Sequence, residues 1–186
     1  MKKFITIFIL LLSFSLFGEG KVIQFDSVSL QAVAYKPLGN YGDISSLSMG
    51  VIEQNNFTLF TSDDIRFLTR MGATYNIPLD DSFTSIYDLT FLLGGGWIFH
   101  PSEKLSLIPQ FAAGLMLHHL TWESGNYSST NIYADQYYSL SLQAGLNLGK
   151  ETGRWELLFT PEVSVFPEQD DLGLLMGASL GLEYNL

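Results

Sequence analysis

The last fifteen residues of the chain alternate between two kinds of side chain. From Leu172 to Leu186 the even positions are apolar or aromatic, whereas most odd positions are glycine or polar. A period of two indicates a β-strand with one apolar face and one smaller or polar face. The segment exceeds the ~9–11 residues that a tilted strand needs to cross a bilayer, and a strand in lipid must be paired along both edges. The pattern therefore predicts one strand of a closed sheet in a membrane.

Seven earlier segments repeat this alternation. They lie at residues 27–35, 46–51, 65–77, 87–99, 105–118, 138–148 and 155–165. Eight strands are an even number, as a single-chain bacterial transmembrane barrel requires. The predicted fold is all-β: a closed eight-stranded antiparallel transmembrane β-barrel with up-and-down topology.

Two irregular places in this pattern carry their own expectations. Residues 57–60 are expected to extend the second strand past Asn55 and Asn56. Pro109 and Pro161 stand in the middle of strands, where a proline cannot donate to the ladder. The apolar residues stay on odd positions beyond each proline, so we expect no one-residue bulge at either.

Composition agrees with a membrane location and excludes several other classes of protein. Hydrophobic residues make up 47% of the chain and charged residues only 15%, whereas soluble domains carry about 25% charged residues. The formal net charge of −10 argues against a nucleic-acid partner, which needs a basic surface. The absence of cysteine excludes a disulfide framework, a thiolate metal site and a cysteine nucleophile.

Residues 1–20 have the features of a cleavable export signal. Two lysines precede an apolar run from Phe4 to Phe17, and Gly18 and Gly20 occupy the −3 and −1 positions of a cleavage site. The run is shorter than the roughly 20 residues that a spanning helix needs, so an N-terminal anchor is the less favoured alternative. The expected organisation is a signal peptide at 1–20 and a barrel domain at 21–186.

The connections between strands predict which end of the barrel faces the exterior. Outer-membrane barrels have short periplasmic turns and longer outer loops. The segments 100–103 and 149–153 are short and turn-like, and we assign them to the periplasmic end together with both termini. Outer loops are then expected at residues 37–44, 78–85, 121–135 and 167–171.

Outward-facing aromatic residues fall at the two ends of the predicted strands. This is the arrangement of two aromatic belts at the two membrane interfaces. The outer belt is expected to contain Tyr75, Tyr87 and Tyr138, and the periplasmic belt Trp97, Phe99, Trp155 and Tyr184.

The opposite parity places charged side chains inside the barrel. The inward-facing charged residues are Arg66, Arg70, Asp88, Glu156, Glu162 and Glu183. Arg70 and Glu162 lie near mid-height on opposite walls, and we expect them to pair across the lumen. Arg66, Glu156 and Glu183 are expected to form a second group nearer the periplasmic end.

These features together resemble small eight-stranded outer-membrane barrel proteins, the class of the OmpA transmembrane domain, OmpX and OmpW. The most specific part of the resemblance is the C-terminus, where Ser179, Gly181, Tyr184 and Leu186 match the family's terminal insertion signal of polar, glycine, aromatic and apolar positions. The terminal Leu replaces the Phe that is usual there. The resemblance implies a location in the outer membrane, contact with its lipid and recognition by the barrel assembly machinery.

No nucleotide-binding, hydrolase or metalloprotease motif occurs in the sequence. One polar cluster, His118, His119, Glu123 and Ser124, lies near the outer rim. Lipid A deacylases of this size use His-x-Ser, but the residues two after His118 and His119 are Leu120 and Thr121. We therefore expect His118 to point into the lumen and His119 to lie at the interface. No catalytic residue, cofactor or metal is assigned, and the acidic outer loops are interpreted as solvated.

The expected function is that of a monomeric, non-enzymatic outer-membrane protein with a surface-exposed structural or interaction role. Two alternatives stay open. One is passage of small hydrophobic molecules, as proposed for OmpW-like proteins, which a continuous apolar path through the lumen would favour. The other is a lipid-modifying enzyme, which a converged His–Ser–Glu geometry would favour.

Removing Tyr184 to Leu186 is expected to abolish membrane assembly. The truncation deletes the aromatic and terminal apolar positions of the insertion signal and shortens the last strand, which must pair with the first one. Outer-membrane fractionation and the heat-dependent gel mobility of folded barrels measure the outcome. Normal assembly of the truncated chain would show that the C-terminal pattern is not an insertion signal.

Overall fold

The computed structural model describes residues 23–59, 64–79, 81–124, 127–148, 154–167 and 172–186. Nearly all of them lie in one antiparallel sheet. Its strands are β1 (Ile23–Leu38), β2 (Ser45–Leu59), β3 (Ile65–Pro78), β4 (Phe83–Trp97), β5 (Phe99–Ser102), β6 (Leu105–Ser124), β7 (Tyr127–Asn147), β8 (Trp155–Pro167) and β9 (Leu172–Asn185). The short helix α2 (Asn40–Ile44) joins β1 to β2. The expected signal peptide and the turn at 149–153 lie outside the described residues.

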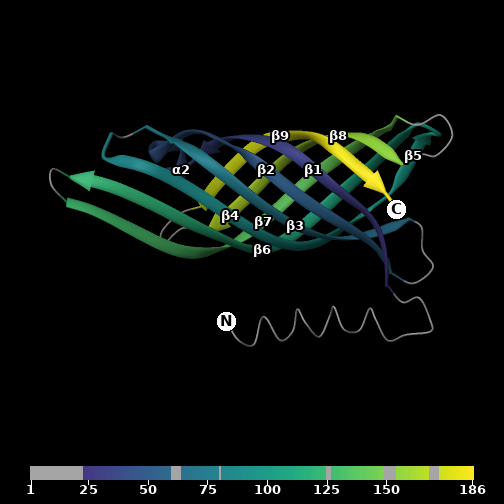
Figure 1. Cartoon of the computed structure of the whole chain (residues 1–186), viewed down its shortest axis with the longest axis horizontal. Helices are drawn as coiled ribbons and strands as arrows, with labels where there is room; N and C mark the ends of the chain where they lie inside the picture. Colours follow the sequence, from purple (N-terminus) through teal and green to yellow (C-terminus); the bar gives the residue numbers. More distant parts are fainter. Residues whose placement is uncertain (1–22, 60–63, 80, 125–126, 149–153, 168–171) are drawn as a thin grey trace.

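The sheet closes into an eight-stranded barrel, in which β4 and the short β5 together count as one strand. Each strand pairs with its neighbours in the chain, and β1 pairs with β9 from Ser27 to Leu38 (Figure 1). The short β5 continues β4 along β6: Gly96 pairs with Gln110 and Phe99 with Leu107, so the offset is unchanged. The predicted closed eight-stranded antiparallel barrel is confirmed.

Both irregular places behave as the sequence predicts. β2 runs without interruption through Phe57 to Leu59, paired with β1 on one side, and Phe57 and Thr58 also pair with β3. Phe60, the last residue of the expected extension, lies outside the described residues. The pairing of β6 with β7 keeps one register past Pro109, and the pairing of β8 with β9 keeps one register past Pro161. Pro161 instead interrupts its ladder with β7, which resumes in the same offset at Ala144 and Phe159. A missing N–H removes ladder bonds without shifting the strand.

The prediction of an outer loop at residues 121–135 is wrong. β6 extends to Ser124 and β7 begins at Tyr127, and the two strands pair along this whole length. Residues 127–135 contain threonine, isoleucine and two tyrosines and no proline, a composition that favours strands. The β6–β7 hairpin therefore continues beyond the barrel at the end that also carries α2 (Figure 1).

The turn expected at 100–103 is also shorter than the sequence suggests. β5 occupies Phe99–Ser102 and pairs with β6, so that Glu103 and Lys104 form the turn. The segment 37–44 holds the end of β1 and the helix α2 rather than an irregular loop.

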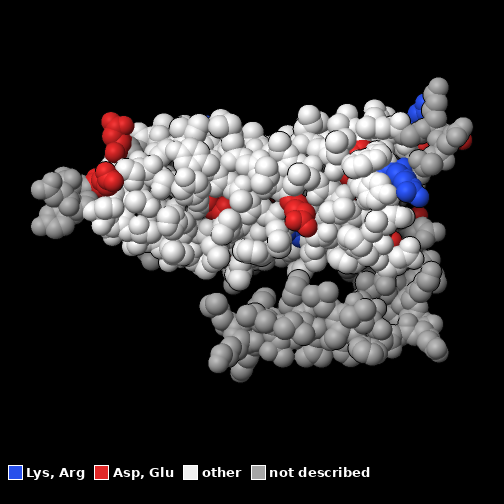
Figure 2. Space-filling view, viewed as in Figure 1, with Lys and Arg blue, Asp and Glu red and all other residues white. Residues whose placement is uncertain are grey.

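The outer wall of the barrel is apolar and exposed. Leu30, Phe91, Leu140 and Leu180 are between 47% and 64% exposed, and each lies on a different strand. Among the described residues, no helix has both the length and the apolar character needed to cross a membrane. Figure 2 shows a wall that is mostly uncharged, with acidic groups at the end that carries α2. We keep the names that the sequence predicts for the two ends: outer for the end with α2 and periplasmic for the opposite end.

The lumen is closed from the outer end by the connection between β1 and β2. Tyr41 on α2 is only 3% exposed and packs edge-on against Phe166, with 5.3 Å between ring centroids. An apolar cluster that includes Val33, Ile52 and Met116 lies in the lumen with these two rings. The barrel interior is therefore a packed core, as expected for a small number of strands.

Candidate functional site

The middle of the lumen contains a buried ion pair. Arg70 on β3 and Glu162 on β8 are each 4% exposed, and an Arg70 Nη2 hydrogen bond joins them across the barrel. The hydroxyls of Ser139 and Ser164 each donate to Glu162 Oε1 at 2.8 Å. Arg70 also lies 3.4 Å from the Tyr35 hydroxyl. Both charges are thus hydrogen-bonded as well as paired, which is the condition for burying an ion pair without a large penalty.

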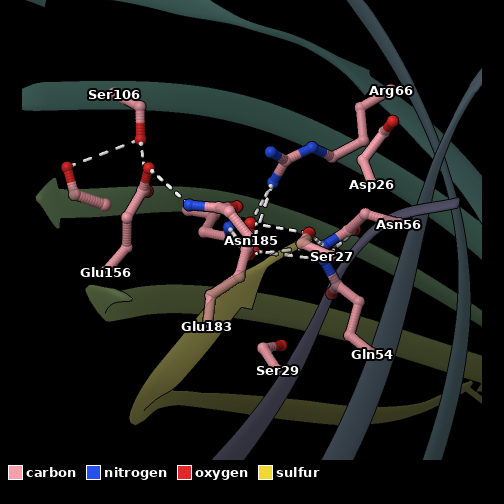
Figure 3. Close-up of polar contacts among 12 residues, drawn as sticks. Asp26, Ser27, Ser29, Gln54, Asn56, Arg66, Ser106, Glu156, Glu183 and Asn185 are labelled. Atoms are coloured by element: carbon pink, nitrogen blue, oxygen red, sulfur yellow. Dashed lines mark hydrogen bonds and ion pairs between the residues drawn. The ribbon is translucent and has the colours of Figure 1, made fainter. Parts of the chain in front are cut away.

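A second ion pair lies nearer the periplasmic end. Arg66 Nη1 is 3.1 Å from Glu183 Oε1 (Figure 3). Glu183 also accepts hydrogen bonds from Ser27 Oγ at 2.8 Å and Gln143 Nε2 at 3.2 Å. Glu183 is thereby bound from several strands at once, which holds opposite walls of the barrel together.

Glu156 belongs to a separate set of contacts. It accepts from Ser106 Oγ at 3.3 Å and from Asn185 Nδ2 at 3.5 Å, whereas Arg66 points to Glu183 (Figure 3). Glu156 and Glu183 are direct neighbours across β8 and β9. Like charges at such positions destabilise a sheet, and the position of Arg66 beside Glu183 compensates for this repulsion.

Asp88 is the anchor of a third cluster near the outer end. Its Oδ1 lies 2.8 Å from His118 Nδ1, and its Oδ2 accepts from the Tyr41 hydroxyl and from Asn76 Nδ2, both at 2.7 Å. His118 Nε2 lies 3.5 Å from Asp135 Oδ2. Asp88 thus ties α2, β3 and β6 together, and its contact with Tyr41 holds the helix over the lumen.

Sequence reasoning missed the uncharged members of these networks. Gln54 and Gln110 both donate to Gln143 Oε1 at 3.1 Å, and Gln31 Oε1 accepts from Ser179 Oγ at 2.6 Å. These side chains occupy the inward-facing positions of the alternating pattern, so the sequence already predicts that they lie in the lumen. Among the described residues, Ser45 Oγ is the single buried side-chain polar atom without a hydrogen-bond partner.

The described residues of the His118 cluster do not include a hydroxyl nucleophile next to a histidine, as a lipid-modifying enzyme would need. His118 is 1% exposed, with its two ring nitrogens facing Asp88 and Asp135, and neither carboxylate is a hydroxyl that the histidine could activate. His119 lies on the other face, 6.2 Å from the Tyr87 ring. Glu123 is exposed, and the side chain of Ser124 lies outside the described structure. No group of metal-ligating side chains occurs among the residues that the structure describes.

Residues of the predicted insertion signal lie at the closure of the barrel. Ser179 and Gly181 on β9 face inward against β1, where a Cβ at Gly181 would lie 2.3 Å from the Leu30 carbonyl oxygen. Leu186 N donates to the Asp26 carbonyl at 2.9 Å. These residues therefore also close the sheet.

Predicted belt residues lie together at the strand ends. Tyr75 and Tyr87 are neighbours on β3 and β4, with 5.2 Å between ring centroids, and Trp155 and Tyr184 are neighbours on β8 and β9 at 4.9 Å. Trp97, Phe99 and Tyr138 are exposed on the outer wall.

Comparisons with known proteins gave matches among solved structures. No protein-family model and no curated protein matches the sequence. The Neisserial surface protein NspA aligns over 90% of this chain and 100% of its own, with a TM-score of 0.62 and 12% identity. The attachment invasion locus protein Ail of Yersinia pestis aligns over 88% and 99%, with a TM-score of 0.57 and 13% identity. The N-terminal barrel domain of Pseudomonas aeruginosa OprF aligns over 88% and 100%, with a TM-score of 0.51 and 13% identity.

The fold is that of a small outer-membrane β-barrel. The apolar wall and the inward polar clusters of this chain are what such a barrel needs, because lipid satisfies no polar group. With this fold the chain has its charge networks inside, where hydrogen bonds to other strands replace hydration.

Removing both partners of the central ion pair should reveal a coupling energy. We expect Arg70→Ala and Glu162→Ala each to lower the free energy of unfolding in lipid vesicles, because each leaves a buried charge unpaired. The double variant should lose less than the sum, by about 1–3 kcal/mol. Urea unfolding followed by tryptophan fluorescence measures these values.

Arg66→Ala combined with Glu162→Ala is the matched control, because Arg66 pairs with Glu183 instead. Its losses should add within about 0.5 kcal/mol. Additive losses for the Arg70 and Glu162 pair as well would contradict the contact.

Proposed function

We propose that this chain is exported by a signal peptide at residues 1–20, assembled into the outer membrane through its C-terminal strand, and active at the cell surface as a non-enzymatic interaction protein. The observation that carries the proposal is the continuation of the β6–β7 hairpin beyond the barrel. β7 pairs with β6 from Tyr127 onward, whereas its described pairing with β8 begins only at Tyr138.

The outer part of β7 supports strand addition as the mode of interaction. Between Tyr127 and Tyr138, the described ladder of β7 is the one with β6, and its described pairing with β8 begins at Tyr138. Natural edge strands are usually protected by lysine, proline or a bulge, and residues 128–134 contain no charge and no proline. An extended segment of another protein can pair with such an edge through main-chain hydrogen bonds.

Side chains along this edge are suited to contact with a protein. Residues 128–134 are all exposed, and they include Asn131, Ile132 at 69% and Tyr133 at 47%. Tyrosine, serine and asparagine are the residues that adaptable binding surfaces use most, because they combine contact area with hydrogen bonding. The hairpin thus combines a backbone template with side chains that can give specificity.

The interior of the barrel does not favour the transport alternative. Tyr41 and Phe166 cover the outer end, and polar side chains fill the periplasmic half. A cavity of about 10 Å³ lies beside Arg70 and Glu162, close to the lower limit for one water molecule. A ligand would have to displace paired charges to pass.

Surface labelling of single cysteines tests this proposal, since the chain has no cysteine of its own. Thr130→Cys lies on the exposed hairpin, and Ser102→Cys lies on exposed β5 at the opposite end. A membrane-impermeant maleimide applied to intact cells should label Thr130→Cys. Ser102→Cys is the matched control and should be labelled only after the outer membrane is permeabilised. Labelling of Ser102→Cys alone, or of neither variant in intact cells, would contradict a surface role for the hairpin.

A further inference from the structure

A carboxyl group lies on the lipid-facing wall of the barrel. Glu53 is exposed near the middle of β2, on the same face as Val51, which is 51% exposed. Its direct neighbours across the sheet are Leu30 on β1 and Met71 on β3, which are 63% and 47% exposed. Figure 2 shows acidic groups in the middle of a wall that is mostly uncharged.

Glu53 is one member of a polar patch that faces outward. Asn55 is the next residue on the same face, and its Nδ2 donates to Glu53 Oε1 at 3.1 Å. Thr69 on β3 lies directly across from Asn55. We call Glu53, Asn55 and Thr69 the β2 patch. Ionisable groups at this depth are costly and rare, and they commonly mark a site with a polar partner.

Small side chains lie on both sides of Val51, which is the next outward residue of β2 on the outer side of the patch. Ala32 on β1 and Ala73 on β3 both pair with Val51, and Ala34 is the next outward residue on β1. Other walls carry larger exposed side chains, such as Leu140 and Leu142 on β7 and Phe159 on β8. Small residues let two membrane-embedded surfaces approach closely, and polar side chains then hydrogen-bond across the contact.

We propose that the β2 patch binds a second copy of this chain in the same membrane. The two-fold axis would run along the membrane normal, so that the same wall of each copy faces the other. The patch is self-complementary, because Asn55 supplies a donor and Glu53 supplies an acceptor. Glu53 of one copy then accepts a hydrogen bond from Asn55 of the partner subunit, and the converse pair forms on the other side of the axis.

A second copy fits the patch better than a partner that supplies only a cation. Such a partner would satisfy Glu53 but would leave unused the second N–H of the Asn55 amide, which the bond to Glu53 within the chain does not occupy. Self-association removes both polar groups from lipid, which offers them no hydrogen bond. The proposed dimer differs from the monomer expected from the sequence, and it is independent of the β6–β7 hairpin.

Cysteine crosslinking in lipid vesicles of purified protein tests the dimer. Val51→Cys places a thiol beside the patch, and Leu142→Cys, 43% exposed on β7, is the matched control on another wall. After mild oxidation Val51→Cys should form a disulfide-linked dimer and Leu142→Cys should not. Equal crosslinking of the two variants, or none, would overturn the proposal.

Substitution of Glu53 identifies the interaction that holds the dimer. In the Val51→Cys background, Glu53→Leu should weaken dimerisation about tenfold or more, because it removes both hydrogen bonds across the axis. Glu53→Gln keeps the length and hydrogen-bonding capacity of the side chain and should retain the dimer. Heat-dependent gel mobility establishes that each variant is folded. Undiminished crosslinking of Glu53→Leu, or crosslinking in cells only to a different protein, would refute the assignment.

Discussion

The barrel is closed by the pairing of β1 with β9, without which the sheet would have two free edges in the membrane. A sheet in hydrocarbon cannot leave an edge unpaired, since each free N–H or C=O costs several kcal/mol there. Twelve residues of β1, from Ser27 to Leu38, meet β9 without a register shift. Gly177 and Gly181 lie at this seam, where a Cβ would lie 2.0 Å and 2.3 Å from a β1 carbonyl oxygen. Closure therefore requires both a complete set of strands and glycine at close approaches between them.

A barrel closed with eight strands has a lumen narrow enough for side chains to fill. Three charge clusters, centred on Glu183, Glu162 and Asp88, are stacked along it from the periplasmic to the outer end. Each cluster takes hydrogen bonds from several strands, so the interior holds the walls together. Because the lumen is filled, we assign the proposed interactions to the outer hairpin and the lipid-facing wall.

Much of this organisation follows from the period of two in the sequence. Whether a residue has an odd or an even position within its strand predicts whether it faces the lipid or the lumen, and this predicts Arg70 and Glu162 inside. The prediction is specific because a slip of one residue would move every side chain of the strand to the opposite face. The contact between Asp88 and His118 needed the register of β4 with β6, which alternation alone does not define. The β6–β7 extension was missed because polar residues outside the membrane no longer alternate with apolar ones. Glu53 was overlooked because the apolar pattern of β2 ends at Val51, although the strand continues.

The barrel is filled, and we propose that its function lies on its outside. Single-channel recording in planar lipid bilayers tests this most directly. The purified protein is expected to give no stable conductance steps, because Arg70 and Glu162 close the mid-lumen and Tyr41 covers its outer end. Substitution of Arg70 and Glu162 together by alanine should be the first change to allow ions through. Large, stable porin-like steps from the unaltered protein would show that the lumen is open.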